Sequence, residues 1–161
     1  MNFYGVGVKP GSLTPKRGYD ILPKCLEYHL WYMGEAKNPV FREIIDKANV
    51  GDVVVVKAFN YKSPKKYHIR AIGIIADKEK PENIPEDLKG KYGFSVTWLK
   101  HFEKKLHLES DDTFMPKGFL SGMPHNNSRT NSIYQETDKS MIEKIQQIMR
   151  YDCVQEWRDF S

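Results

Sequence analysis

The most constraining feature of this sequence is a pair of apolar segments near its centre. Residues 53–56 are four consecutive valines, and a β-branched run of this kind is typical of a strand that is buried on both faces of a sheet. Residues 68–76 form a second apolar segment, and the polar connection 60–65 separates the two. We therefore expect a hairpin at the centre of an antiparallel or mixed sheet.

Two further segments have the alternating pattern that predicts a strand. One is residues 3–8, and the other is residues 92–98, which place aromatic side chains on one face. Between 103 and 132 the pattern is weaker, and only short strands near 106–108 and 118–120 are expected.

Apolar residues recur at helical spacing in segments 39–48 and 138–150, which predicts an amphipathic helix in each. A shorter helix is expected between residues 22 and 30, because Pro23 can open a helix at its first turn. Residues 81–90 contain two prolines and are expected to form a loop.

This order of strands and helices lacks a regular strand–helix–strand alternation. An α+β fold with a small curled β-sheet or barrel, flanked by helices, fits the order better than a doubly wound sheet does. A length of 161 residues suits one hydrophobic core. We therefore expect a single domain over residues 1–161.

Composition narrows the classes of protein to which the chain can belong. Hydrophobic residues make up 40% and charged residues 29%, as in globular domains. No run approaches the ~20 apolar residues that a membrane helix needs, and residues 1–8 lack the features of a signal peptide. Cys25 and Cys153 form neither a disulfide framework nor a metal site. We therefore expect a cytoplasmic protein that has no membrane partner.

Motifs that carry catalysis or bind cofactors are missing from the sequence. Gly5 and Gly7 are not followed directly by a helix, as a dinucleotide fingerprint requires. The five histidines lack zinc-ligand spacing, and neither cysteine has an obvious histidine and amide partner. We expect no catalytic residues, no metal and no cofactor, and an unrecognised nuclease or transferase is the least favoured alternative.

Aromatic side chains are abundant, with nine tyrosines, eight phenylalanines and three tryptophans. Most are expected in the core, but some lie beside predicted loops, where a planar base can stack on them at ~1–3 kcal/mol per base. These pocket candidates are Trp31, Tyr32, Phe59 and Tyr61. For Trp31 a core plug and a stacking platform are about equally favoured. Trp98 is a further pocket candidate, although its alternating strand favours a core position by about two to one.

Basic residues gather between Asp52 and Asp77, a stretch that holds no acidic residue, within a chain of net charge +4. Its candidates for contacts with a nucleic-acid backbone are Lys57, Lys62, Lys65 and Lys66. A solvated hairpin explains this stretch as well as a phosphate-facing loop does. Residues 126–132 are a second polar stretch, in which Ser128 and Arg129 could contact phosphate or a base edge. An ordinary loop is the alternative there.

Several segments, taken in order, resemble the PUA-like superfamily. They are residues 18–31 (GYDI to LW), 51–56 (GDVVVV), 69–75 (IRAIGII), 92–99 (YGFSVTWL) and 127–136 (NSR and IYQE). Within the superfamily they are similar to the EVE and YTH branch, and to EVE-like modules that precede some modification-dependent restriction enzymes. The resemblance covers roughly residues 18 to 150 and rests on the ordered set rather than on one motif.

The resemblance implies a small curled barrel whose aromatic pocket holds a flipped, modified base, with a basic rim for the backbone. On this basis Trp31 matches the first tryptophan of the methyl-base cage. The resemblance also implies that Tyr19 and Asn60 lie near the pocket and that Arg129 faces phosphate.

The chain departs from the YTH pattern at the second tryptophan of the cage. That residue comes from the loop before the later strand, where this chain has Ile84, Pro85 and Leu88. The departure argues against a complete aromatic cage for methylated adenine. An EVE-like pocket for another modified base, or for another ligand, meets no such objection.

The leading hypothesis is a non-catalytic module that captures a flipped, modified base in an aromatic pocket. The expected partners are DNA or RNA carrying such a base, together with an effector protein. A small-molecule or nucleotide sensor that uses the same pocket is the main alternative, and salt distinguishes the two because only polymer binding weakens steeply with ionic strength. A protein-interaction module with exposed aromatic residues is a third reading.

Overall fold

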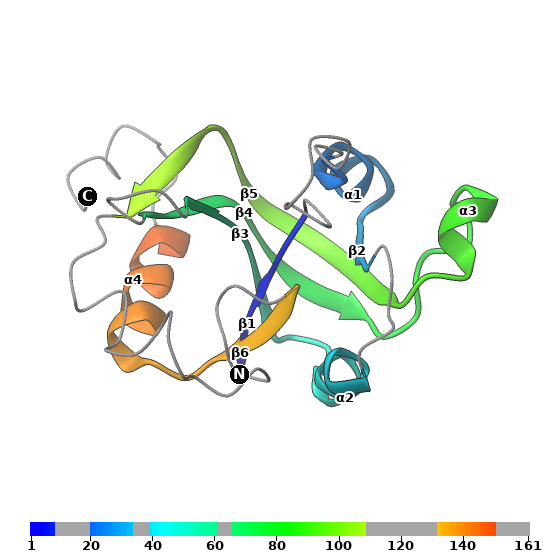
Figure 1. The fold of residues 1–161 in the computed structure, drawn as a ribbon, viewed down its shortest axis with the longest axis horizontal. Helices are drawn as coiled ribbons and strands as arrows, with labels where there is room; N and C mark the ends of the chain where they lie inside the picture. The colour runs from blue at the N-terminus through cyan, green and yellow to red at the C-terminus, as the bar shows by residue number, and fades with distance from the viewer. Residues whose placement is uncertain (9–19, 34–38, 61–65, 109–131, 151–161) are drawn as a thin grey trace.

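The computed structural model describes residues 1–8, 20–33, 39–60, 66–108 and 132–150, with the backbone alone at 58–60, 66–68 and 103–108. Figure 1 shows a strongly curled sheet with helices around it. In chain order the elements are β1 (Phe3–Val6), α1 (Leu22–Tyr28), β2 (Leu30–Tyr32), α2 (Pro39–Lys47), β3 (Val53–Asn60), β4 (Lys66–Asp77), α3 (Glu86–Lys89), β5 (Gly93–Leu108), β6 (Ile133–Glu136) and α4 (Lys139–Arg150).

The six described strands form one mixed sheet in the order β2-β5-β4-β3-β1-β6. β1 pairs with β3 in parallel, and the other neighbouring pairs are antiparallel. The register shifts once between β3 and β4 and three times between β4 and β5, and such bulges increase local twist. The sheet accordingly curls into a half-barrel (Figure 1). The expected α+β class is confirmed, and so is the central hairpin, which β3 and β4 form.

The two faces of the sheet carry separate hydrophobic cores. The four valines at 53–56 are at most 1% exposed, which confirms that this strand is buried on both faces. Val54 and Val56 pack in one cluster with residues of α1 and α2, whereas Val53 and Val55 pack in another with residues of α4. In Figure 1, α1 and α4 accordingly lie on either side of the central strands.

The segment expected as one helix over residues 22–30 is divided into a helix and a strand. α1 ends at Tyr28 because His29 adopts a left-handed conformation with φ 55°, and the His29 N–H bonds to the carbonyl of Cys25. Leu30 then begins β2, which pairs with β5. The expectation of a helix as far as residue 30 is therefore wrong at its C-terminal end.

Residues 81–90, expected as a loop, contain the short helix α3. Glu86 and Asp87 lie in its first turn, where acidic side chains are favoured. Lys80 Nζ donates to the carbonyls of Leu88 at 2.7 Å and Lys89 at 2.8 Å, at the other end of the helix. These end contacts explain a helix that is too short to produce a periodic pattern.

Two further expectations concern the later part of the chain. Residues 106–108 are the end of the long strand β5 and not a separate strand, and residues 118–120 lie outside the described residues. Residues 133–136, for which no strand was expected, form β6 beside β1. Among the described helices, none has the length and apolar character needed to cross a membrane.

Candidate functional site

Trp31 lies in the edge strand β2 and is almost fully buried. Its Nε1 donates a hydrogen bond to the carbonyl of Gly7 at 3.0 Å. Its ring centroid lies 5.5 Å from that of Phe94, at an interplanar angle of 38°, and the residue is 1% exposed. Gly93 allows β5 to approach so closely, because a Cβ atom there would meet the Trp31 carbonyl. The indole is therefore fixed between the end of β1 and the start of β5.

Tyr32 and Trp98 contribute to the same core as Trp31. Tyr32 is 3% exposed, and Trp98 is half-buried, with its Nε1 donating to the Cys25 carbonyl at 2.9 Å. Burial raises the pKa of the Cys25 thiol to about 12, so this side chain is protonated at neutral pH and is not a nucleophile. The structure thus brings three of the predicted pocket aromatics into one cluster around α1.

Three segments converge on the residues that follow β1. The Gly7 N–H donates to the Ser132 carbonyl at 2.8 Å, and the Ile21 N–H donates to the Val8 carbonyl at 2.8 Å. Together with the Trp31 bond to Gly7, these contacts join β2, the start of α1 and the segment before β6 at one place. Trp31 is thus connected through backbone hydrogen bonds to the start of α1 and to the segment before β6.

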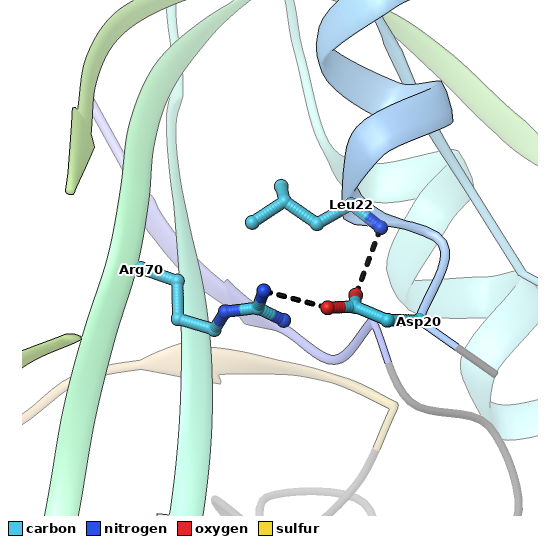
Figure 2. Close-up of polar contacts among 3 residues, drawn as sticks. All are labelled: Asp20, Leu22 and Arg70. Atoms are coloured by element: carbon cyan, nitrogen blue, oxygen red, sulfur yellow. Dashed lines mark hydrogen bonds and ion pairs between the residues drawn. The ribbon is translucent and has the colours of Figure 1, made fainter. Parts of the chain in front are cut away.

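Asp20 and Arg70 form an ion pair beside this junction. Arg70 Nη2 lies 2.6 Å from Asp20 Oδ2, and Asp20 Oδ1 accepts the N–H of Leu22 at 3.0 Å. Figure 2 shows Arg70 reaching from β4 toward Asp20, which lies just ahead of α1. The side chains are 16% and 26% exposed for Arg70 and Asp20, respectively. Partial burial and two hydrogen bonds on one carboxylate make this a stronger pair than a surface ion pair.

Sequence reasoning missed this pair. Arg70 entered only as part of the basic stretch between Asp52 and Asp77 and of the resembling segment 69–75, and Asp20 only as part of the resembling segment 18–31. The available signal was local: Asp20 stands two residues before Leu22, where an aspartate side chain commonly accepts a backbone N–H at the start of a helix. Its pairing with a residue fifty positions away has no such signal.

Lys57 lies in the interior of the sheet, with 7% of the residue exposed. Its Nζ is 5.9 Å from the centroid of the Tyr134 ring. Burial lowers the pKa of the Lys57 ammonium from 10.5 to about 7, because a low-dielectric interior disfavours the charged form. A buried lysine of this kind differs from a solvent-facing phosphate contact, and the predicted contact between Lys57 and a nucleic-acid backbone stays a prediction.

The other predicted site residues cannot be compared with a side-chain position. Phe59, Asn60 and Lys66 lie at the β3–β4 hairpin, where only the backbone is described. Six more lie outside the described residues: Tyr19, Tyr61, Lys62, Lys65, Ser128 and Arg129. Within the described part of the chain, no group of three or more histidine, cysteine, aspartate or glutamate side chains could hold a metal ion.

Comparisons of the sequence and of the fold give different results. No protein-family model matches the sequence, and no curated protein matches it. The fold, by contrast, matches the YTH domain of the Zygosaccharomyces rouxii MRB1 protein in complex with N6-methyladenosine RNA. The TM-score is 0.56 at 13% identity, over 95% of this chain and 87% of that one.

Two other solved structures match over nearly their whole length. Human THYN1 protein, in complex with 5-methylcytosine-containing DNA, has a TM-score of 0.54 at 13% identity, over 95% of this chain and 100% of that one. A hypothetical protein from Leishmania major has a TM-score of 0.52 at 11% identity, over 94% of this chain and 98% of that one. At such identities the likeness establishes the fold. The chain has an EVE/YTH-like fold, and the fold expected from the resemblance is confirmed.

Proposed function

We propose, on the premise of its EVE/YTH-like fold, that this chain is a non-catalytic nucleic-acid-binding module that captures one flipped, modified base beside Trp31. The observation that carries the proposal is the shared fold. The similar MRB1 domain was solved with N6-methyladenosine RNA and the similar THYN1 protein with 5-methylcytosine-containing DNA, and each covers 95% of this chain. Because a fold alone does not specify a ligand, the geometry around Trp31 has to support the proposal as well.

The surroundings of Trp31 suit a stacking platform. Its N–H is bonded to Gly7 and its ring is supported by Phe94, so the orientation of the indole plane is fixed before a ligand arrives. Extraction of a base costs a few kcal/mol, and stacking returns ~1–3 kcal/mol per base. A fixed platform loses little entropy on binding, which increases the fraction of this gain that contributes to affinity.

The burial of Trp31 has a consequence for the mechanism. With 1% of the residue exposed, a base can stack on the indole only if neighbouring side chains move. We therefore expect the pocket to open as the base enters, as happens in a minority of binding sites. The cost of this opening lowers the affinity and should make the association slower than diffusion allows.

Contacts with the nucleic-acid backbone would come from the basic residues named from the sequence, with Ser128 as a neutral donor: Lys57, Lys62, Lys65, Lys66 and Arg129. These contacts supply the salt-sensitive part of the affinity. An effector protein, a cytoplasmic location and a single domain over residues 1–161 stay predictions from the sequence.

A binding titration tests the proposal. Short single- and double-stranded oligonucleotides that carry one 5-methylcytosine or one N6-methyladenosine are compared with unmodified oligonucleotides of the same sequence, at low and high salt. We expect one modified oligonucleotide to bind more tightly than its unmodified counterpart, and binding to weaken as salt rises. Equal binding of every modified and unmodified pair would exclude base capture.

Variants of Trp31 locate the pocket. Trp31→Ala should abolish the preference for the modified base, and Trp31→Phe should weaken it, because the smaller ring loses stacking area and the bond to Gly7. Since Trp31 is a core residue, its loss also destabilises the fold. Phe102→Leu is a matched control, because Phe102 is buried in the core on the other face of the sheet. A preference for the modified base that survives in Trp31→Ala would show that the pocket does not lie at Trp31.

A nucleotide or small-molecule sensor that uses the same aromatic residues is the second candidate, since Trp31 is 1% exposed and a ligand beside it would be covered by protein. An enclosed aromatic site suits a ligand that is surrounded on most sides. The affinity for such a ligand would depend little on salt, whereas the affinity for an oligonucleotide would fall as the salt concentration rises. The same titration with free modified nucleosides therefore separates the two candidates.

A further inference from the structure

Arg70 has a hydrogen-bond donor that no described residue satisfies. Its Nη2 binds Asp20, but its Nη1 is buried and has no hydrogen-bond partner within the described part of the chain. Buried donors are rarely left unpaired, because removing one from water without a new partner is unfavourable. A cationic group makes the imbalance larger. An unsatisfied donor of this kind therefore suggests a group that is brought by a ligand.

The backbone explains why Arg70 is aimed at this place. Opposite β3, Lys57 pairs with Ile69 and Val56 pairs with Ala71, so Arg70 is the extra residue of a bulge. A bulge redirects the side chain that it carries. Here the guanidinium is directed toward Asp20 and the start of α1 (Figure 2).

The same contacts place Arg70 on the face of the sheet that carries Trp31. The Arg70 guanidinium pairs with Asp20 just before α1, and Leu22 and Cys25 of α1 pack in the core cluster that contains Trp31. Asp20 is followed by Ile21, whose N–H bonds to Val8, and Val8 adjoins Gly7, which accepts the Trp31 indole bond. Trp31 and the segment that carries Asp20, which fixes Arg70, are thus both joined by hydrogen bonds to Gly7 and Val8.

We propose that Arg70 Nη1 donates a hydrogen bond to an acceptor atom on the edge of the captured base, and that Asp20 orients the guanidinium for this contact. The inference rests on the proposed function and adds a specificity-determining residue to it. A guanidinium only donates, so it selects bases that present a carbonyl oxygen or an unprotonated ring nitrogen at that position. Because its planar fork is rigid, one arm held by Asp20 fixes the direction of the other.

Charge favours a base over a phosphate as the partner of Arg70. Asp20 already neutralises the guanidinium, so the pair as a whole offers little attraction to a phosphate anion. A base edge is neutral, so a hydrogen bond to it does not depend on a net positive charge of the pair. Burial points the same way, since backbone phosphates stay in contact with water whereas a flipped base does not.

The test uses the full chain and whichever oligonucleotide carrying 5-methylcytosine or N6-methyladenosine it binds more tightly. Arg70→Gln should weaken binding of that oligonucleotide by about tenfold and reduce its advantage over the unmodified one. The slope of log Kd against log salt should stay unchanged, because a base contact releases no counterion from the backbone. A slope that falls by about one would identify a phosphate contact and overturn the inference.

Arg70→Lys separates a binding role from a structural one. Lysine can keep the charge and the pair with Asp20 but has no planar fork to present a second donor. We expect a stability close to that of the wild type together with a reduced preference for the modified base. Asp20→Asn, which leaves the guanidinium unneutralised and less firmly oriented, should also reduce the preference and steepen the salt slope.

Arg42→Gln serves as the matched control, because Arg42 is exposed and lies over the Tyr92 ring, away from the pair. It removes a positive charge and should leave the preference for the modified base unchanged. A wild-type preference that is retained in both Arg70 variants would overturn this inference alone. Equal binding of modified and unmodified oligonucleotides by the wild type would overturn the proposed function, and the inference with it.

Discussion

Replacing Lys57 by methionine should remove a pH-dependent contribution to the free energy of unfolding. The Lys57 ammonium has its pKa lowered from 10.5 to about 7 by burial. Between these two values the unfolded chain binds a proton at this residue that the folded chain does not bind. The free energy of unfolding of the wild type therefore rises as pH increases from about 7 to 10.5. This gain in stability is lost as pH falls back toward 7.

The magnitude follows from the same two values. The free energy of unfolding of the wild type changes by about 1.4 kcal/mol for each tenfold change in proton concentration. Between about pH 7 and pH 9 the wild type should therefore gain roughly 2 kcal/mol relative to Lys57→Met. Below about pH 7 both states of the wild type are protonated, so the difference between the two proteins should become constant. Methionine fits the site because it is apolar and similar in length.

Urea unfolding followed by circular dichroism measures this difference at a series of pH values. Lys47→Met is the control for the loss of a positive charge, since Lys47 is exposed and pairs with Glu43 on its own helix. The difference in free energy of unfolding between wild type and Lys57→Met should grow with pH. The difference between wild type and Lys47→Met should not grow in this way. A wild-type minus Lys57→Met difference that is constant from about pH 7 to pH 9 would refute the reasoning.

Three further predictions test other parts of the structure. Gly5→Ala should destabilise the fold by about 1–3 kcal/mol, because a Cβ atom there would overlap the ring of Tyr134. Gly90→Ala is the control and should be nearly neutral, because a Cβ atom at Gly90 meets open space. Equal effects of the two variants in urea unfolding would contradict this. Cys25, with its thiol pKa raised to about 12 by burial, should resist iodoacetamide at about pH 8 in a Cys153→Ser background and react once the chain is unfolded; rapid native labelling, detected by mass spectrometry, would count against it. Asp52→Ala should cost about 2–4 kcal/mol in urea unfolding, because this buried carboxylate accepts two backbone N–H groups; a cost below about 1 kcal/mol would show that the two bonds contribute little.

The sequence predicted the elements whose pattern is long and consistent. The valine run at 53–56 indicated burial on both faces because β-branched side chains leave neither face polar, and both faces are covered. The segments 39–48 and 138–150 gave helices because one stripe of each is apolar, and α2 and α4 occupy most of them. The aromatic strand from residue 92 was expected as well, although its continuation to Leu108 was not.

The elements that were missed are short or are fixed by distant contacts. β2 has three residues and follows a helix that ends at the left-handed His29, so its pattern merges with that of α1. β6 and α3 have four residues each, too few for a period to be read. For such elements, pairing with a neighbour decides the structure, and the neighbour is distant in the sequence.

The site shows the same division. Trp31 was identified as a candidate because of its residue type and its place beside a predicted loop. The bulge at Arg70 and its pair with Asp20 depend on register and on a contact between residues fifty positions apart. Lys57 was assigned to a basic surface stretch, but the strand register carries it into the interior. Local composition gave no indication of this, because lysine is rarely buried.

The central claim, that a modified base is captured beside Trp31, is tested most directly by the NMR signal of the Trp31 indole N–H. This group donates to the Gly7 carbonyl in the structure, and Trp31→Phe assigns its signal. Addition of the preferred modified oligonucleotide should shift the Trp31 indole signal, while the unmodified oligonucleotide at the same concentration leaves it in place. The backbone amide of Ile145, in α4 on the other face of the sheet, should be unaffected by both. A Trp31 signal that stays unchanged at saturating modified oligonucleotide would contradict the account.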